Sequence, residues 1–235
     1  MTAGDAAPVT PGALWVADRD GIAVLDSTGE VLLEIATDRP VRATAFDRAR
    51  DTVWVLDDRG ELSAFDLEGM KLGSVEVPSS PPSPSSPPAN RDPELVIDSP
   101  AATLWLLAGN TLYRFDAQGD FQQALDLDPA ERLQGLALDE ARSRLWLANA
   151  RSLKAFDPSG ANTHTIEVDL PSPGIEATAF DPFLDALWVA GGGRVQRYDG
   201  EGQPVFEAEA GREIKHIAAD GRGGAWLAGP ERLEH

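Results

Sequence analysis

The sequence predicts an all-β protein, a β-propeller built of four-stranded antiparallel blades. Three observations predict it: tryptophan recurs at a nearly constant interval, each interval carries a turn of the form Asp-x-x-Gly, and no window repeats its apolar residues with the period of a helix. A repeat of about 40 residues that contains four short strands is typical of a propeller blade. The 6 tryptophans favour six blades, with a five-bladed ring or an open segment of a longer array as alternatives.

The tryptophans share one sequence frame. Five of the 6 are flanked on both sides by Leu or Val, and the last lies between Ala and Leu. The positions are Trp15, Trp54, Trp105, Trp146, Trp188 and Trp226. Strands that are apolar on both faces must be covered on both faces, and blades stacked around an axis supply that cover. The tryptophans are therefore predicted to lie in the core, rather than to form carbohydrate-stacking platforms.

Aspartates mark the ends of two further strands in each repeat. The first strand ends in an apolar residue and Asp, at Asp47, Asp98, Asp139, Asp181 and Asp220. The third strand ends in an Asp that opens an Asp-x-x-Gly turn, at Asp26, Asp66, Asp116, Asp157 and Asp199. In such a turn the carboxylate accepts backbone N–H bonds and the glycine tolerates a positive φ. One carboxylate per turn is too few for a calcium loop, so the pattern predicts hairpins between strands three and four.

The fourth strands carry acidic residues. These are Glu34, Glu76, Asp126, Glu167 and Glu207. Charges on an outermost strand discourage edge-to-edge association. Part of the net charge of −19 is therefore expected to protect the rim of the propeller rather than to bind a ligand.

Counting strands along the repeats gives 21, because the first repeat has no room for its first strand and the sixth stops after its second, at Pro230. In the five-bladed alternative, the strand at residues 214–220 closes the first blade. We expect a flexible lead-in at residues 1–11 and one propeller domain at residues 12–230, with a Pro/Ser-rich surface insert at residues 78–90. Residues 231–235 form a tail whose Leu-Glu-His ending is typical of a cloning scar before a polyhistidine tag.

Composition excludes several classes of function. With 20 Lys and Arg against 39 Asp and Glu, unaided binding to nucleic acid or to an anionic membrane is not expected. The absence of cysteine excludes disulfides and Cys-ligated metals. No apolar run approaches the length of about 18 residues that membrane insertion needs. The acidic composition and lack of cysteine are in line with a secreted or periplasmic module, and no cofactor is predicted.

The repeat resembles a known family. Residues 136–139, 145–148 and 153–160 are similar to the NHL repeat, and to the related YVTN-type and regucalcin/gluconolactonase-type propellers. The resemblance covers residues 13–228. It implies four-stranded blades, usually six, whose first strands line a central channel. It also implies binding of protein, nucleic acid or carbohydrate in many members, and metal-dependent lactone hydrolysis in some.

If first strands line a channel, the residues near their starts form its mouth. These residues are Arg42, Glu94, Gln134, Glu176, Lys215 and His216. Polar groups of both charges would converge there, so we expect a site for a small polar ligand. The lactonase-like propellers hold a metal with a carboxylate–amide–carboxylate set, which only Glu94, Gln134 and Glu176 could supply. Glutamine would stand there in place of the usual asparagine, so no metal ligand or catalytic residue is assigned.

The predicted function is that of a non-catalytic propeller domain of a larger bacterial protein. It would bind a protein or a small polar ligand on one rim face. The alternative is a metal-dependent, lactonase-like hydrolase with its site at the channel mouth.

Overall fold

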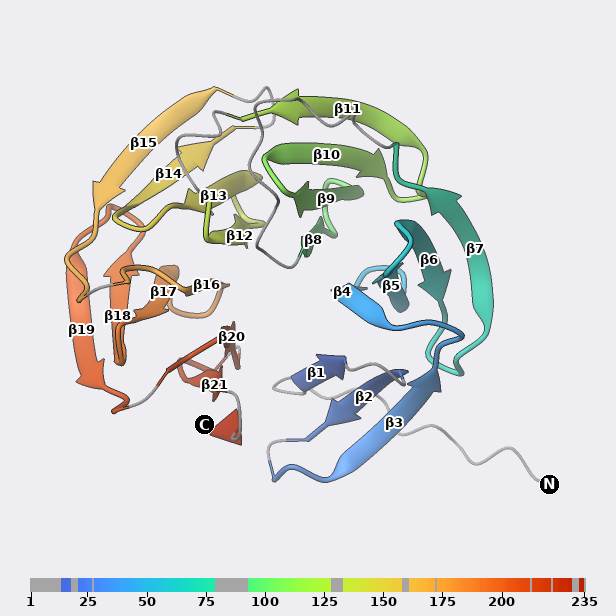
Figure 1. Cartoon of the computed structure of the whole chain (residues 1–235), viewed down its shortest axis with the longest axis horizontal. Helices are drawn as coiled ribbons and strands as arrows, with labels where there is room; N and C mark the ends of the chain where they lie inside the picture. The colour runs from blue at the N-terminus through green and yellow to red at the C-terminus, as the bar shows by residue number, and fades with distance from the viewer. Residues whose placement is uncertain are drawn as a thin grey trace. The chain divides into compact units, whose positions relative to one another are not determined.

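The computed structural model describes residues 14–17, 21–26, 28–78, 93–127, 133–157, 161–171, 173–211, 213–220, 222–229 and 233–234. All regular elements in these ranges are β-strands, and neighbouring strands pair in sequence order within each sheet (Figure 1). The all-β propeller of antiparallel blades is therefore confirmed. None of the described segments is a helix that could cross a bilayer. The chain forms two compact units, at residues 1–124 and 125–235.

Unit 1 holds the first three sheets. The first has three strands: β1 (Leu14–Ala17), β2 (Gly21–Leu25) and β3 (Val31–Ala36). The second has four: β4 (Val41–Asp47), β5 (Thr52–Asp57), β6 (Glu61–Phe65) and β7 (Lys71–Glu76). The third also has four, the last of which runs just into unit 2: β8 (Glu94–Asp98), β9 (Thr103–Ala108), β10 (Thr111–Asp116) and β11 (Phe121–Asp126).

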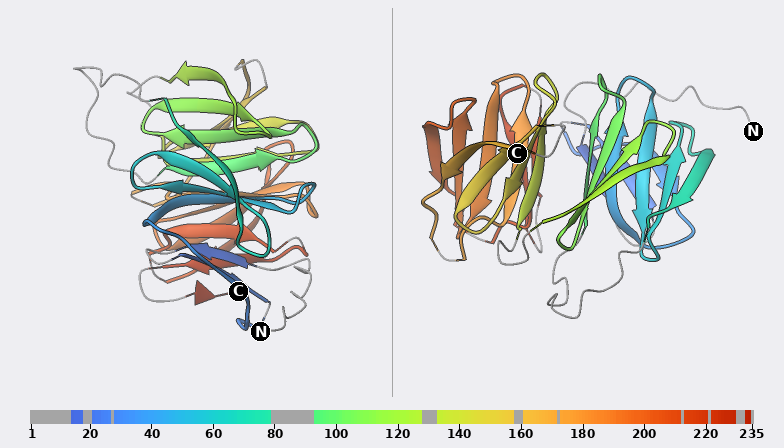
Figure 2. Two further views of the ribbon diagram at one scale, coloured as in Figure 1. Left: turned by 90° about the vertical axis from the view of Figure 1, so that its right-hand side faces the viewer. Right: turned by 90° about the horizontal axis from the view of Figure 1, so that it is seen from above.

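Unit 2 holds the other three sheets. The fourth comprises β12 (Gly135–Asp139), β13 (Arg144–Ala148), β14 (Ser152–Phe156) and β15 (Asn162–Glu167). The fifth comprises β16 (Ala177–Asp181), β17 (Ala186–Gly191), β18 (Arg194–Asp199) and β19 (Pro204–Glu209). The sixth comprises β20 (His216–Ala219), β21 (Ala225–Ala228) and β22 (Leu233–Glu234). Figure 2 shows the twist of these sheets from the side.

The predicted strand count holds from β1 to β21, and the structure adds one strand. The two sheets nearest the ends of the chain each have three strands, as incomplete repeats should. The additional strand is the two-residue β22, which pairs with Leu227 and Ala228 beyond Pro230, where the sequence pattern had stopped. Strand β20 pairs with β21, so residues 216–219 belong to the sheet of the last tryptophan.

The tryptophan strands β5, β9, β13 and β17 are covered on both faces, as predicted, whereas Val16 on β1 is 37% exposed. Trp54 packs with Leu95 and Phe115 of the following blade, whereas Val53 and Val55 pack with the preceding one. The alternation of side chains along a strand explains this division, because neighbouring residues point to opposite faces. The same arrangement recurs in unit 2, and the five tryptophans whose side chains are described are at most 8% exposed.

The Asp-x-x-Gly turns also form as predicted. The Asp199 carboxylate accepts the backbone N–H of Glu201 at 3.0 Å and of Gln203 at 2.8 Å, and Gly202 has φ +84°. The turns at Asp26, Asp66 and Asp116 repeat this pattern. Gly160 lies outside the described residues, as does nearly all of the Pro/Ser-rich insert.

Acidic side chains of the fourth strands lie exposed, as rim protection requires. Beside them, Glu61 on β6 forms ion pairs with Lys71 at 2.5 Å and with Arg39 at 3.5 Å. The hydrogen bond from Lys71, more than any other contact, lowers the pKa of Glu61 to about 2.

The pKa of Glu61 predicts a weak acid-dependent loss of stability. Because the folded pKa lies below the unfolded value, the ion pair stabilises the protein at neutral pH, and its contribution is lost as pH falls from about 4.5 to about 2. Because both side chains of the pair are partly exposed to water, the ion pair should change the free energy of unfolding by less than about 1 kcal/mol. A carboxyl titration followed by NMR should place the Glu61 midpoint near 2, and Lys71→Ala should raise it. An unchanged midpoint in that variant would show that Lys71 does not hold the carboxylate.

Candidate functional site

The predicted channel-mouth residues lie near the starts of first strands, in two groups. Unit 1 contributes Arg42 on β4 and Glu94 on β8. Unit 2 contributes Gln134 and Glu176, which directly precede β12 and β16, together with Lys215 and His216 at the start of β20. Within unit 2 these three first strands are neighbours (Figure 1), so this part of the set does share one end of adjacent strands.

Two members of the unit 2 group, Glu176 and Lys215, interact electrostatically. The pKa of Lys215 is raised, mainly by its ion pair with Glu213 and to a lesser degree by Glu176. Glu176 is half-buried and accepts the backbone N–H of Gly192 at 3.2 Å. Both side chains therefore already have partners within unit 2. Binding of a small polar ligand by the six residues stays a prediction.

The opposite ends of the first strands carry buried aspartates that hold the hairpins. The Asp139 carboxylate accepts a hydrogen bond from the guanidinium of Arg142 at 2.9 Å. The same guanidinium donates to the carboxylate of Asp185, in the next blade, at 2.6 Å. The pKa of Asp185 is lowered, chiefly by this contact with Arg142. Asp181 instead accepts two backbone N–H groups of its own hairpin. These contacts account for the recurring Asp as a structural residue.

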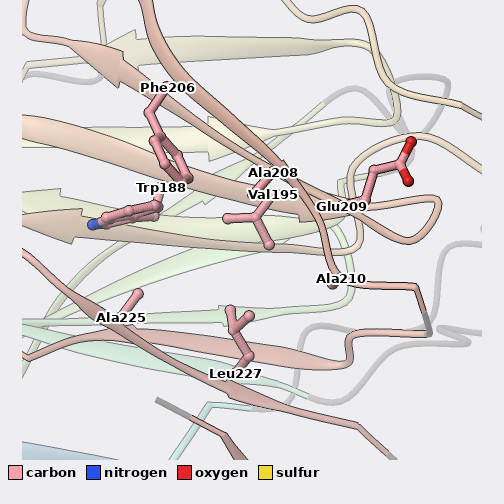
Figure 3. Close-up of a pocket in the computed structure, with 8 residues that line it drawn as sticks. All are labelled: Trp188, Val195, Phe206, Ala208, Glu209, Ala210, Ala225 and Leu227. Atoms are coloured by element: carbon pink, nitrogen blue, oxygen red, sulfur yellow. The ribbon is translucent and has the colours of Figure 1, made fainter.

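Unit 2 contains an apolar pocket of about 190 Å³ (Figure 3). Its lining comes from β17, β18 and β19 of the fifth sheet and from β21 of the sixth. Trp188 and Phe206 form one wall, Ala225 and Leu227 face them, and the Glu209 carboxylate stands at the edge. The remaining lining residues are Val195, Ala208 and Ala210.

Aromatic and charged contacts hold the first wall of the pocket in place. The rings of Trp188 and Phe206 meet edge to face, with centroids 5.6 Å apart. The Arg197 guanidinium stacks over both, at 5.2 Å and 5.7 Å from the ring centroids. Phe206 remains 43% exposed although it makes these contacts. Phe206 is therefore the solvent-exposed part of this aromatic wall, whereas Trp188 is buried.

Comparison with the other blades explains why the pocket is open. The position of Ala208 on the fourth strand is equivalent to that of Ile166, because these residues pair with Val195 and Leu153 respectively. Ile166 is 5% exposed and lies against the Gly202 turn of the following blade. Ala208 is exposed. The smaller side chain at this position leaves this part of the fourth strand exposed.

Sequence reasoning did not find this pocket, although two signals point to it. The fourth strands carry Ile35, Val75 and Ile166 at the position where the fifth has Ala208. In addition, the residue before the sixth tryptophan is Ala225, where the other repeats have Leu or Val. Together, these differences mark the place where blade stacking is interrupted.

Comparisons with known proteins give no family. No protein-family model matches the chain, and no curated protein matches it significantly. Among the described residues, no three His, Asp or Glu side chains gather closely enough to hold a metal ion. The propeller fold and the pocket geometry are therefore the observations on which a functional proposal can rest.

Proposed function

We propose that this propeller is a non-catalytic binding module that holds an apolar segment of another protein in the pocket between β19 and β21. The observation that carries the proposal is the exposed ring of Phe206, which packs on the buried Trp188 and lies beside the exposed Ala208 in an apolar pocket. Apolar concavities bordered by polar groups mark protein-binding sites, because burying them removes apolar area from water. The resemblance of the repeat to NHL-type propellers, many of which bind proteins, supports the same class of function.

Selection from a random peptide library tests the proposal. Wild-type protein should enrich peptides that contain aromatic residues, and the variant Ala208→Glu should lose them, because a carboxylate would lie against the Phe206 ring. Val205→Glu is the matched control. Val205 is about as exposed as Phe206 and lies on the same strand, but it is not part of the pocket lining. Peptides that bind the Ala208→Glu variant as well as wild type would show that the pocket is not the binding site.

A further inference from the structure

The pocket has the size and the walls to hold one aromatic ring. Its volume is about 190 Å³, and an apolar cavity of about 150 Å³ is already large enough for benzene. The exposed ring of Phe206 offers a bound ring an edge-to-face contact, which is an arrangement that aromatic pairs prefer. Ala225 and Leu227 face this wall with side chains that carry no polar group. A ring can therefore enter without leaving a buried polar group of the pocket unpaired.

The preceding blade shows that an aromatic ring packs at the equivalent place. In the registers of the two sheets, Trp188 and Val195 of the pocket correspond to Trp146 and Leu153. Trp146 and Leu153 belong to one buried cluster with Tyr198 of the fifth sheet. This type of wall therefore already accepts an aromatic side chain elsewhere in unit 2.

A carboxylate at the edge of the pocket adds a preference for positive charge. Glu207 and Glu209 both lie near the Arg194 guanidinium, at 2.8 Å and 3.7 Å. The closer contact is made by Glu207, and the Glu209 side chain is 80% exposed. Two carboxylates beside one cation leave an excess of negative charge, on a chain whose net charge is −19. A cationic group of a ligand would offset this excess, whereas an anionic group would be repelled.

The aromatic wall and the carboxylate lie at different ends of the pocket. Trp188 and Phe206 are at one end and Glu209 is at the other (Figure 3). Phe206 and Glu209 are three residues apart on β19, which corresponds to about 10 Å of strand. A ring and a charged group on neighbouring residues can span about this distance when the charged side chain is long and flexible, as in lysine.

We infer that the pocket selects partner segments in which an aromatic residue stands next to a lysine or arginine. The ring enters the pocket against Phe206, and the cation pairs with Glu209. This inference rests on the proposed function and names the kind of segment that binds. Burial of the ring supplies most of the affinity because it removes apolar area from water. The ion pair stays partly exposed, so it contributes less to affinity and mainly determines which segments are preferred.

Four acetylated and amidated dipeptides test both parts of the inference: Phe-Lys, Phe-Gln, Phe-Glu and Ala-Lys. We expect Phe-Lys to bind wild-type protein about tenfold or more tightly than Ala-Lys, which lacks the ring. Phe-Lys should bind about two- to fivefold more tightly than Phe-Gln, as for a partly exposed ion pair, and Phe-Glu should bind most weakly of the three Phe peptides. NMR titration at low salt measures the dissociation constants.

The indole signals in the same titration show where the ring binds. The Trp188 indole N–H donates to Asp181 at 3.4 Å, and its ring lines the pocket, so its signal should shift when Phe-Lys is added. The Trp146 indole is 1% exposed and packs between the fourth and fifth sheets, so it is the control and should not shift. An unchanged Trp188 signal on binding would place the peptide elsewhere and overturn the inference.

Removal of one carboxylate isolates the charge preference. Glu209→Gln should abolish the preference for Phe-Lys over Phe-Gln and change the affinity for Phe-Gln by less than about twofold. Glu201→Gln is the matched control, because it removes the same charge from an exposed residue in the turn before β19, and it should keep the preference. A salt concentration of about 1 M should act on wild type as Glu209→Gln does, because it screens charges beyond about 3 Å.

Each other outcome counts against the inference. Equal binding of the three Phe peptides would overturn it and leave the proposed function standing, with a pocket that selects the ring alone. A lysine preference that persists in Glu209→Gln would also overturn it. If Phe-Lys binds no better than Ala-Lys, or does not bind at millimolar concentration, the inference fails and the library selection decides the proposed function separately. Self-association of the protein that Phe-Lys disrupts would identify a second copy as the occupant, against the inference.

Discussion

Replacing Trp146 by alanine should lower the free energy of unfolding by about 3–5 kcal/mol, the range measured for large aromatic-to-alanine changes in protein cores. The indole is 1% exposed and packs with Leu187 and Tyr198 of the following blade, so its removal opens a cavity between two sheets. Each sheet is held by its own backbone hydrogen bonds, so the two sheets cannot move together freely to fill the cavity. Urea denaturation followed by circular dichroism measures the loss.

Phe183→Ala is the control for Trp146→Ala. Phe183 is also an aromatic residue of unit 2, but it is 67% exposed, so its replacement should change stability by less than about 0.5 kcal/mol. If the Trp146 variant lost no more than this control, the tryptophans would not be the contacts that join the blades.

Replacing Gly202 by alanine should destabilise the protein by about 2–5 kcal/mol, for two separable reasons. At φ +84° any Cβ is strained, which costs about 1–2 kcal/mol. The new Cβ would also stand 2.6 Å from Ile166 Cγ1 of the preceding blade, and such overpacking typically costs about 1–3 kcal/mol more. The glycine of this turn is therefore needed for its conformation and for blade stacking.

Gly29→Ala isolates the conformational part of this loss. Gly29 closes the same turn at φ +85°, but nothing lies within 4 Å of the point where its Cβ would stand. Only the backbone strain should be measured there, about 1–2 kcal/mol by the same denaturation experiment. Equal losses in the two variants would show that Ile166 moves aside and that the turn does not press against the preceding blade.

The local pattern of the sequence was sufficient to predict the blades. The frame around Trp54 and Trp146 requires cover on two faces, and the turn at Asp199 is specified by four consecutive residues. Such features depend on contacts within a strand or a hairpin, so they can be read from residue order. The first-strand aspartates were recognised as strand ends, but their burial and the Arg142 link between blades depend on residues far apart in the chain, such as Arg142 and Asp185.

The sequence by itself determined the strand pattern, the turns and the sandwiching of the tryptophans, because period-two alternation and turn chemistry are local properties. Only the tertiary structure decided where this regular stacking is interrupted. The pocket beside Phe206 arises because Ala208 and Ala225, which come from two adjacent sheets, both carry small side chains. This interruption is a property of two adjacent sheets rather than of any one segment.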